Sequence, residues 1–213
     1  MTTWQELQAE VADRLAAASP DERVVFAVGV AERLMRAQEA LPAHEQAEYA
    51  LGLRPTLNAL WEAALGNASA FGEIKHGLGE HLLSEYCHND GQAGPGDADE
   101  PAAAAVLHTA VAYLFGAGDP VPLVSSRAVQ AADARSNAGE RANTGERLNN
   151  SDSNAVDPDA MLTAELHRQL RDLTLIRQHS ASLRHARLGL DIDTSARLHR
   201  ALRIPLSTVE TDA

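Results

Sequence analysis

The sequence predicts an all-α fold, a single bundle of about seven or eight helices with one flexible polar insertion before the last helices. Alanine is abundant and aromatic residues make up only 4% of the 213 residues, a composition that suits helix interfaces better than strands. Apolar residues recur at steps of three and four along most of the chain. No segment shows a convincing alternation of apolar and polar residues, which would indicate strands.

Several residues in the first half of the chain predict where helices begin. Thr3 is positioned to cap a first helix with apolar residues at helical spacing. Ser19, Pro20 and Glu22 form a second start signal, because serine caps, proline suits the first turn and the glutamate can close a capping box. The helix that follows is apolar over a wide arc and is expected to be central. Pro42 and Pro55 mark two further possible starts.

The second half continues as helices with two interruptions. A helix is expected from about residue 69 to residue 86, and residues 89–100, rich in glycine and aspartate, form a loop. Pro101 opens a helix that is almost entirely apolar or small, and another helix covers about residues 122–135. These segments assign residues 1–135 to the main helical bundle.

A polar segment then separates the bundle from the last helices. Residues 137–142 (NAGERA) are echoed by residues 143–148 (NTGERL), and no apolar stripe runs through them, so residues 136–157 are interpreted as a flexible insertion. Residues 158–204 are expected to form C-terminal helices that pack on the bundle. Residues 205–213 are expected to be a frayed tail.

Composition narrows the class of protein. The net charge of −12 disfavours a generic binder of nucleic acids or anionic membranes, because phosphate contacts need clustered cations. Cys87 is the single cysteine, which excludes an intrachain disulfide and a four-cysteine zinc site. The N-terminus lacks the features of a signal peptide, and no apolar stretch is long enough to span a bilayer. A cytoplasmic protein that contacts no membrane is expected.

Charge is distributed unevenly along the chain. Residues 1–163 carry 10 basic and 24 acidic residues, whereas residues 164–204 carry 8 arginines and 4 acidic residues. The segments therefore have net charges of −14 and +4, and the basic segment is interpreted as docking on an acidic bundle. An alternative is a basic arm for an acidic partner, including a nucleic acid bound through the segment after Ser180.

A cluster of possible metal ligands lies between residues 73 and 88. His81, Glu85 and His88 are spaced at i, i+4 and i+7 and would share one side of a helix. Imidazole and carboxylate groups bind zinc and other transition metals, so these three residues are the candidate ligands of a metal-dependent enzyme. The competing interpretation is a solvated helix flank.

Two polar pairs lie beside apolar stripes in helices far apart in the sequence, Glu32 with Arg33 and Glu165 with Gln169. Such groups could act as acid and base in a pocket. The competing interpretation, which we favour, is that they form buried ion pairs or hydrogen bonds between helices.

Short motifs in the predicted helices resemble those of the YjaG-like bacterial family of unknown function over about residues 4–178. The matching residues are Phe26, Glu32-Arg33-Leu34-Met35, Leu60-Trp61, Ala112-Tyr113, Ser125-Ser126, Ala132-Asp133, Glu165 and Gln169. The resemblance implies an all-helical fold. It implies no catalytic residues.

Together these observations predict a cytoplasmic helical protein that binds another macromolecule, as an adaptor, a regulatory protein or an immunity-type protein. The expected partner is a protein or a second copy of the chain, and no cofactor is expected. The two alternatives are a metal-dependent enzyme using residues 73–88 and a nucleic-acid-binding regulator using the basic C-terminal segment.

Overall fold

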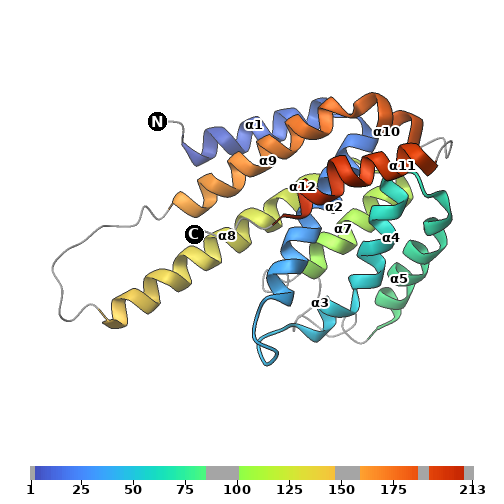
Figure 1. Ribbon diagram of the computed structural model, residues 1–213. Helices are drawn as coiled ribbons and strands as arrows, with labels where there is room; N and C mark the ends of the chain where they lie inside the picture. Colours follow the sequence, from blue (N-terminus) through green and yellow to red (C-terminus); the bar gives the residue numbers. More distant parts are fainter. Residues whose placement is uncertain (1–2, 85–100, 147–158, 187–191, 209–213) are drawn as a thin grey trace.

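The computed structural model describes residues 3–84, 101–146, 159–186 and 192–208, and these residues form helices joined by turns, with no strand among them (Figure 1). The prediction of an all-α protein is confirmed. The longer elements are α1 (Trp4–Ala17), α2 (Pro20–Glu39), α4 (Arg54–Ala64), α5 (Phe71–Leu83), α7 (Pro101–Phe115), α8 (Pro120–Glu146) and α9 (Ala160–Gln178). The shorter ones are α3 (Glu48–Gly52), η1 (Ala68–Ala70), α10 (Ser180–Ala186), α11 (Ile192–Leu198), the π-helical turn η2 (His199–Arg203) and α12 (Ile204–Ser207).

The two predicted N-terminal caps form as capping boxes. In α1 the Thr3 hydroxyl accepts the backbone N–H of Glu6, and the Glu6 carboxylate accepts the backbone N–H of Thr3. Ser19 and Glu22 make the same pair of bonds at the start of α2, with Pro20 as its first residue. Each box satisfies backbone donors that a helix start otherwise leaves without partners.

Helix α2 is the centre of the bundle. It contacts α4, α7, α8, α9 and α12, and its residues from Val25 to Met35 are all buried. Helix α7 packs along α2 and is itself buried on most sides, because alanine covers much of its surface and lets neighbouring helices approach. Trp61 of α4 is fully buried. The largest fully buried side chains, Trp61, Phe26 and Met35, lie on α2 and α4 and belong to one hydrophobic core cluster.

The C-terminal helices cover the bundle. Helix α9 lies beside α1 and also contacts α8 and α2, and the α11–α12 segment crosses α2 (Figure 1). Within the described ranges, none of the helices has both the length and the apolarity that a membrane crossing requires.

Part of the predicted polar insertion is helical. Helix α8 continues through Glu146, so residues 136–146 are helical, and residues 147–158 lie outside the described part of the chain. The prediction failed because the loss of an apolar stripe reports only that a segment does not pack against a core. Alanine, glutamate and arginine still favour helix in a segment that extends from a packed helix.

The predicted frayed tail is also wrong over residues 205–207, which belong to α12. Leu206 is buried against α2, where its Cβ lies 3.1 Å from the position that a side-chain β-carbon would take on Gly29. The absence of a side chain at Gly29 allows this close approach. One-turn helices such as α12 are too short to show a periodic stripe, which explains why the sequence predicts fewer helices than the structure contains.

Candidate functional site

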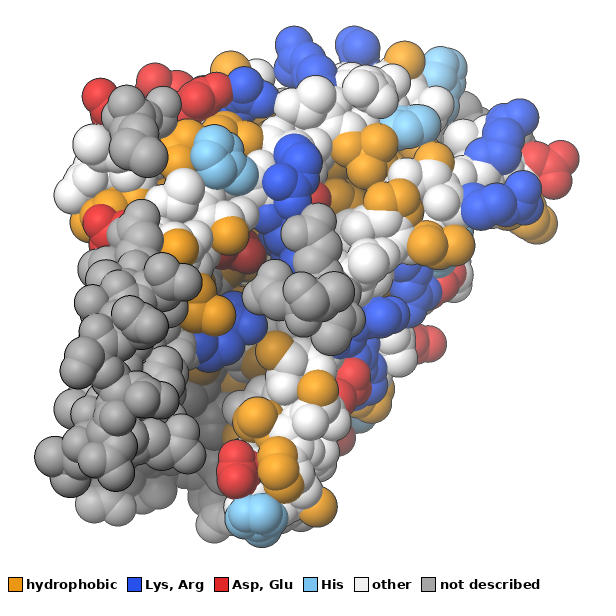
Figure 2. Space-filling model, turned by 60° about the vertical axis from the view of Figure 1, so that its left-hand side comes forward, with side chains coloured by type: hydrophobic (Ala, Val, Ile, Leu, Met, Phe, Trp, Pro, Cys, Tyr) orange, Lys and Arg blue, Asp and Glu red, His pale blue; other side chains and the backbone are white. Residues whose placement is uncertain are grey.

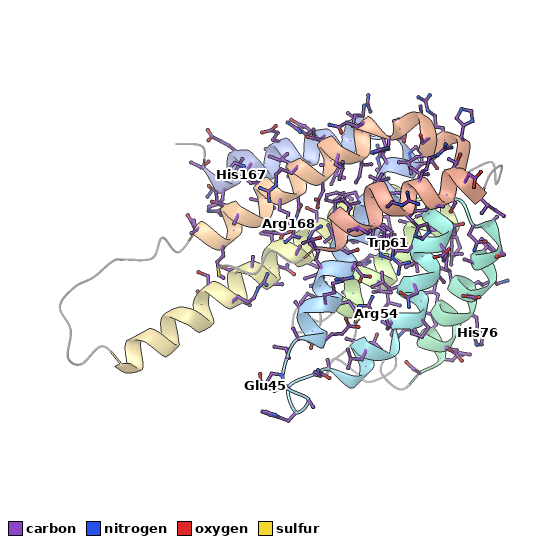
Figure 3. The ribbon with its side chains drawn as sticks, in the orientation of Figure 1. Glu45, Arg54, Trp61, His76, His167 and Arg168 are labelled. Atoms are coloured by element: carbon purple, nitrogen blue, oxygen red, sulfur yellow. The ribbon has the colours of Figure 1, made fainter. Side chains whose placement is uncertain are left out.

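Glu32 is a buried carboxylate that joins two helices. It accepts hydrogen bonds from Arg36 Nε at 2.8 Å, Arg54 Nη1 at 2.8 Å and Trp61 Nε1 at 3.2 Å. Burial alone would raise the pKa of Glu32, but these three donors together lower it below its ordinary value. The side chain is therefore held as an acceptor and is poorly suited to deliver a proton. Arg54 also binds Glu39 with two hydrogen bonds, which extends the network to the surface. Arg54 and Trp61 both lie on α4 (Figure 3).

The other predicted polar pair, Glu165 with Gln169, belongs to a network around Arg33. Arg33 Nη1 lies 2.6 Å from Asp172 Oδ2 and also donates to the backbone oxygen of Leu206 at 3.2 Å, while Arg33 Nη2 lies 3.4 Å from Glu165 Oε1. Burial raises the pKa of Asp172, which Arg33 and Arg168 oppose. Gln169 then connects Glu165 to Ser125 of α8 through bonds of 3.0 Å and 2.6 Å.

These contacts bring together three of the four residues in the predicted polar pairs, namely Arg33, Glu165 and Gln169. Glu32 belongs to the separate network around Arg54. The favoured interpretation, buried ion pairs and hydrogen bonds between helices, is the arrangement observed. Each group has a partner on another helix, so the two networks fix how α2, α4, α8 and α9 sit against one another.

The structure describes only one of the three predicted metal ligands. His81 is buried, and its Nδ1 atom lies 2.9 Å from the Tyr49 hydroxyl of α3. Burial lowers the pKa of His81, which favours the neutral imidazole. His76, on the same helix, projects away from the bundle and pairs with Glu80 at 3.1 Å (Figure 3). No group of three or more potential ligands occurs within the described ranges.

Glu85 and His88 lie outside the described residues, so the metal site at these positions stays a prediction.

A concave site that the sequence did not predict lies where the ends of several helices meet. This cavity has a volume of about 320 Å³ and is lined by the first turns of α2 and α8, the ends of α4 and α7, the start of α5, and α10. Most of the lining residues are alanine, glycine or other apolar residues. Such small residues leave open the space that larger side chains would fill. We call this site the α2–α7 cavity.

Arg23 is a cation in the wall of this cavity. Its Nε and Nη2 atoms donate to the backbone oxygens of Leu15 and Ala16 at 2.8 and 2.7 Å, at the end of α1. Its Nη1 atom lies against Gly118 so closely that a β-carbon on Gly118 would collide with it. Among the described residues, the hydrogen-bond partners of Arg23 are these two carbonyls, and no carboxylate pairs with it.

Aromatic side chains border the same cavity. Phe71 and Tyr113 both line it, with ring centroids 6.5 Å apart, and Phe115 directly precedes the lining residue Gly116. Phe71 is 47% exposed and Phe115 is 72% exposed. The chain has three phenylalanines, and Phe26 in the core is the third. We call Phe71, Tyr113 and Phe115 the aromatic rim.

The basic C-terminal segment is tied to the bundle by ion pairs. Arg177 lies 3.4 Å from Glu22, and Arg203 lies 3.5 Å from Glu62 and also sits over the Trp61 ring. Both pairs join an arginine of this segment to an acidic residue of the bundle, which is the docking that the charge asymmetry predicts. On the face shown in Figure 2, basic side chains lie among acidic and hydrophobic ones.

Comparisons of the chain with protein-family models, with curated proteins and with solved structures find no match. The resemblance to the YjaG-like family therefore stays a prediction.

Proposed function

We propose that this protein acts by binding a protein partner, and that the partner contacts the aromatic rim around the α2–α7 cavity. The observation that carries the proposal is the exposure of two phenylalanines, Phe71 in the wall of the cavity and Phe115 next in the chain to the lining residue Gly116. Phenylalanine is usually buried, and aromatic residues next to pockets are frequent centres of binding energy in protein interfaces.

The surroundings of the rim support this choice. Six α-helices contribute to the cavity, and the Glu32 and Arg33 networks fix several of them in place. A rigid surface loses little conformational freedom when a partner binds, and this favours affinity. The partner is either a different protein or a second copy of this chain.

Site-specific photo-crosslinking in cells tests the proposal. A photoreactive phenylalanine analogue replaces Phe71 in one sample and Met161 in another. Met161 is 39% exposed and does not line the cavity. It lies at the N-terminal end of α9, away from α10 (Figure 1). We expect a single protein adduct at position 71 and none at position 161.

A second substitution shows whether the adduct reports specific binding. Phe115→Ser should reduce the adduct at position 71 about tenfold, the effect expected for loss of an interface anchor. Equal adducts at positions 71 and 161, or an adduct at position 71 that Phe115→Ser leaves unchanged, would count against the proposal.

A further inference from the structure

The α2–α7 cavity is lined mainly by apolar residues together with Arg23 and Tyr113, each of which has a hydrogen-bond donor without a partner among the described residues. The Arg23 Nε and Nη2 atoms donate to backbone oxygens at the end of α1. The third nitrogen atom of the guanidinium, Nη1, makes no hydrogen bond within the described chain. The Tyr113 hydroxyl also has no hydrogen-bond partner there. A few polar groups in an otherwise apolar pocket are the usual composition of a ligand site.

The chemistry of these two donors indicates which class of ligand the cavity can bind. Burial raises the pKa of Tyr113, so its hydroxyl keeps its proton at neutral pH and can donate. The Arg23 guanidinium is always charged and forms its strongest hydrogen bonds with carboxylates and phosphates. The cavity walls near Val24, Ala64 and Leu183 accept an apolar group. The cavity volume of about 320 Å³ is near the lower limit for ligand sites, which restricts the ligand to a small one.

We infer that the α2–α7 cavity binds a carboxylate carried on a small apolar body, with Arg23 and Tyr113 as the donors. Two sources share this chemistry: the C-terminal carboxylate of a partner chain that ends in an apolar residue, and a free apolar acid. Because the cavity adjoins the aromatic rim, the first source rests on the proposed function. The second source does not require it.

Calorimetric titration of the whole chain at about pH 7, where a carboxylic acid is ionised, tests the inference. The probes are 4-methylpentanoate and its amide, and acetyl-Ala-Ala-Leu with a free or an amidated C-terminus. We expect each acid to bind at least about tenfold more tightly than its amide, the effect of one charged hydrogen bond. Tighter binding of the tripeptide acid identifies a chain end, and equal or tighter binding of 4-methylpentanoate identifies a free acid.

Four variants separate the donors from general packing. Arg23→Gln should abolish the preference for the acid, and Tyr113→Phe should weaken acid binding about threefold or more without affecting the amide. Asp21, which also lines the cavity, repels an anion, so Asp21→Asn should strengthen acid binding. Arg177 lies outside this cavity, so Arg177→Gln should leave the binding of acids and amides unchanged.

Three results would overturn the inference: neither acid binds, acids and amides bind equally, or Arg23→Gln and Tyr113→Phe both keep the wild-type preference. Since Arg23→Gln also removes two bonds to α1, Tyr113→Phe provides the test if that variant fails to fold. If no acid binds but the crosslink at position 71 forms, the carboxylate site alone is refuted. If an acid binds but no crosslink forms at position 71, the proposed protein binding alone is refuted.

Discussion

Glu32 illustrates at the residue scale how one buried carboxylate organises its surroundings. Its two oxygens receive three donors from α2 and α4, which compensate its negative charge. Arg36 and Arg54 are partly exposed, whereas Glu32 is only 3% exposed. Removing the negative charge would leave Trp61 Nε1 with a weaker acceptor and Arg36 to be solvated by water, while Arg54 would keep its bonds to Glu39.

We therefore expect Glu32→Gln to lower the free energy of unfolding by about 2 kcal/mol. This is less than the cost of breaking a fully buried ion pair, because the two arginines can reach solvent. Urea unfolding measures the change. Glu39→Gln is the matched control, since Glu39 also pairs with Arg54 but is 39% exposed, and it should cost less than about 1 kcal/mol.

The pKa of Glu32 also sets a pH dependence. Because its folded-state pKa lies below the ordinary value of 4.5, the ionised carboxylate contributes stability above the unfolded-state pKa. This stability is lost as the pH falls through the folded-state pKa. We expect the free energy of unfolding to fall below about pH 4.5, and the fall to be smaller in Glu32→Gln.

The raised pKa of Asp172 has the opposite sign, since protonation of that group favours the folded state. Its contribution cancels when wild type and Glu32→Gln are compared at each pH. An identical acid-induced loss of stability in the two proteins would contradict the role assigned to Glu32.

At the scale of elements, α12 shows what a single turn contributes. Leu206 fills the space above Gly29, and its backbone oxygen accepts a hydrogen bond from Arg33. We expect Leu206→Ala to cost about 3 kcal/mol, because it opens a cavity at the surface of α2. Ile204→Ala, in the same turn but 64% exposed, should cost less than about 0.5 kcal/mol. Thermal unfolding of the two variants compares them, and equal losses would mean that α12 does not dock as described.

The elements also show how far the sequence predicts the fold. The caps at Thr3 and Ser19 and the apolar stripe of α1 are confirmed because caps and helix periodicity are local properties of the chain. The packing of α12 was predicted incorrectly because it depends on contacts with distant residues, and the end of α8 because a helix can continue beyond its apolar stripe. Periodicity cannot indicate that Leu206 docks on Gly29, 177 positions earlier in the chain.

At the scale of the whole molecule, the candidate site could be predicted only in part. Glu32, Arg33, Glu165 and Gln169 were identified because polar residues beside apolar stripes need partners. Their partners Asp172, Ser125 and Trp61 come from tertiary packing, which the sequence did not specify. The α2–α7 cavity left no local signal, because residues of six α-helices and of the turns between them surround it and Arg23 resembles an ordinary surface residue in the sequence.

Native mass spectrometry of the untagged protein, isolated gently from its own source, tests whether the chain binds a protein partner. We expect a complex that is heavier than the 22.7 kDa chain, by a partner or by a second copy. A variant with Phe71→Ser and Phe115→Ser should appear as the 22.7 kDa chain alone, because the aromatic rim is lost. A bare chain in the wild type, or a complex that persists in the double variant, would contradict it.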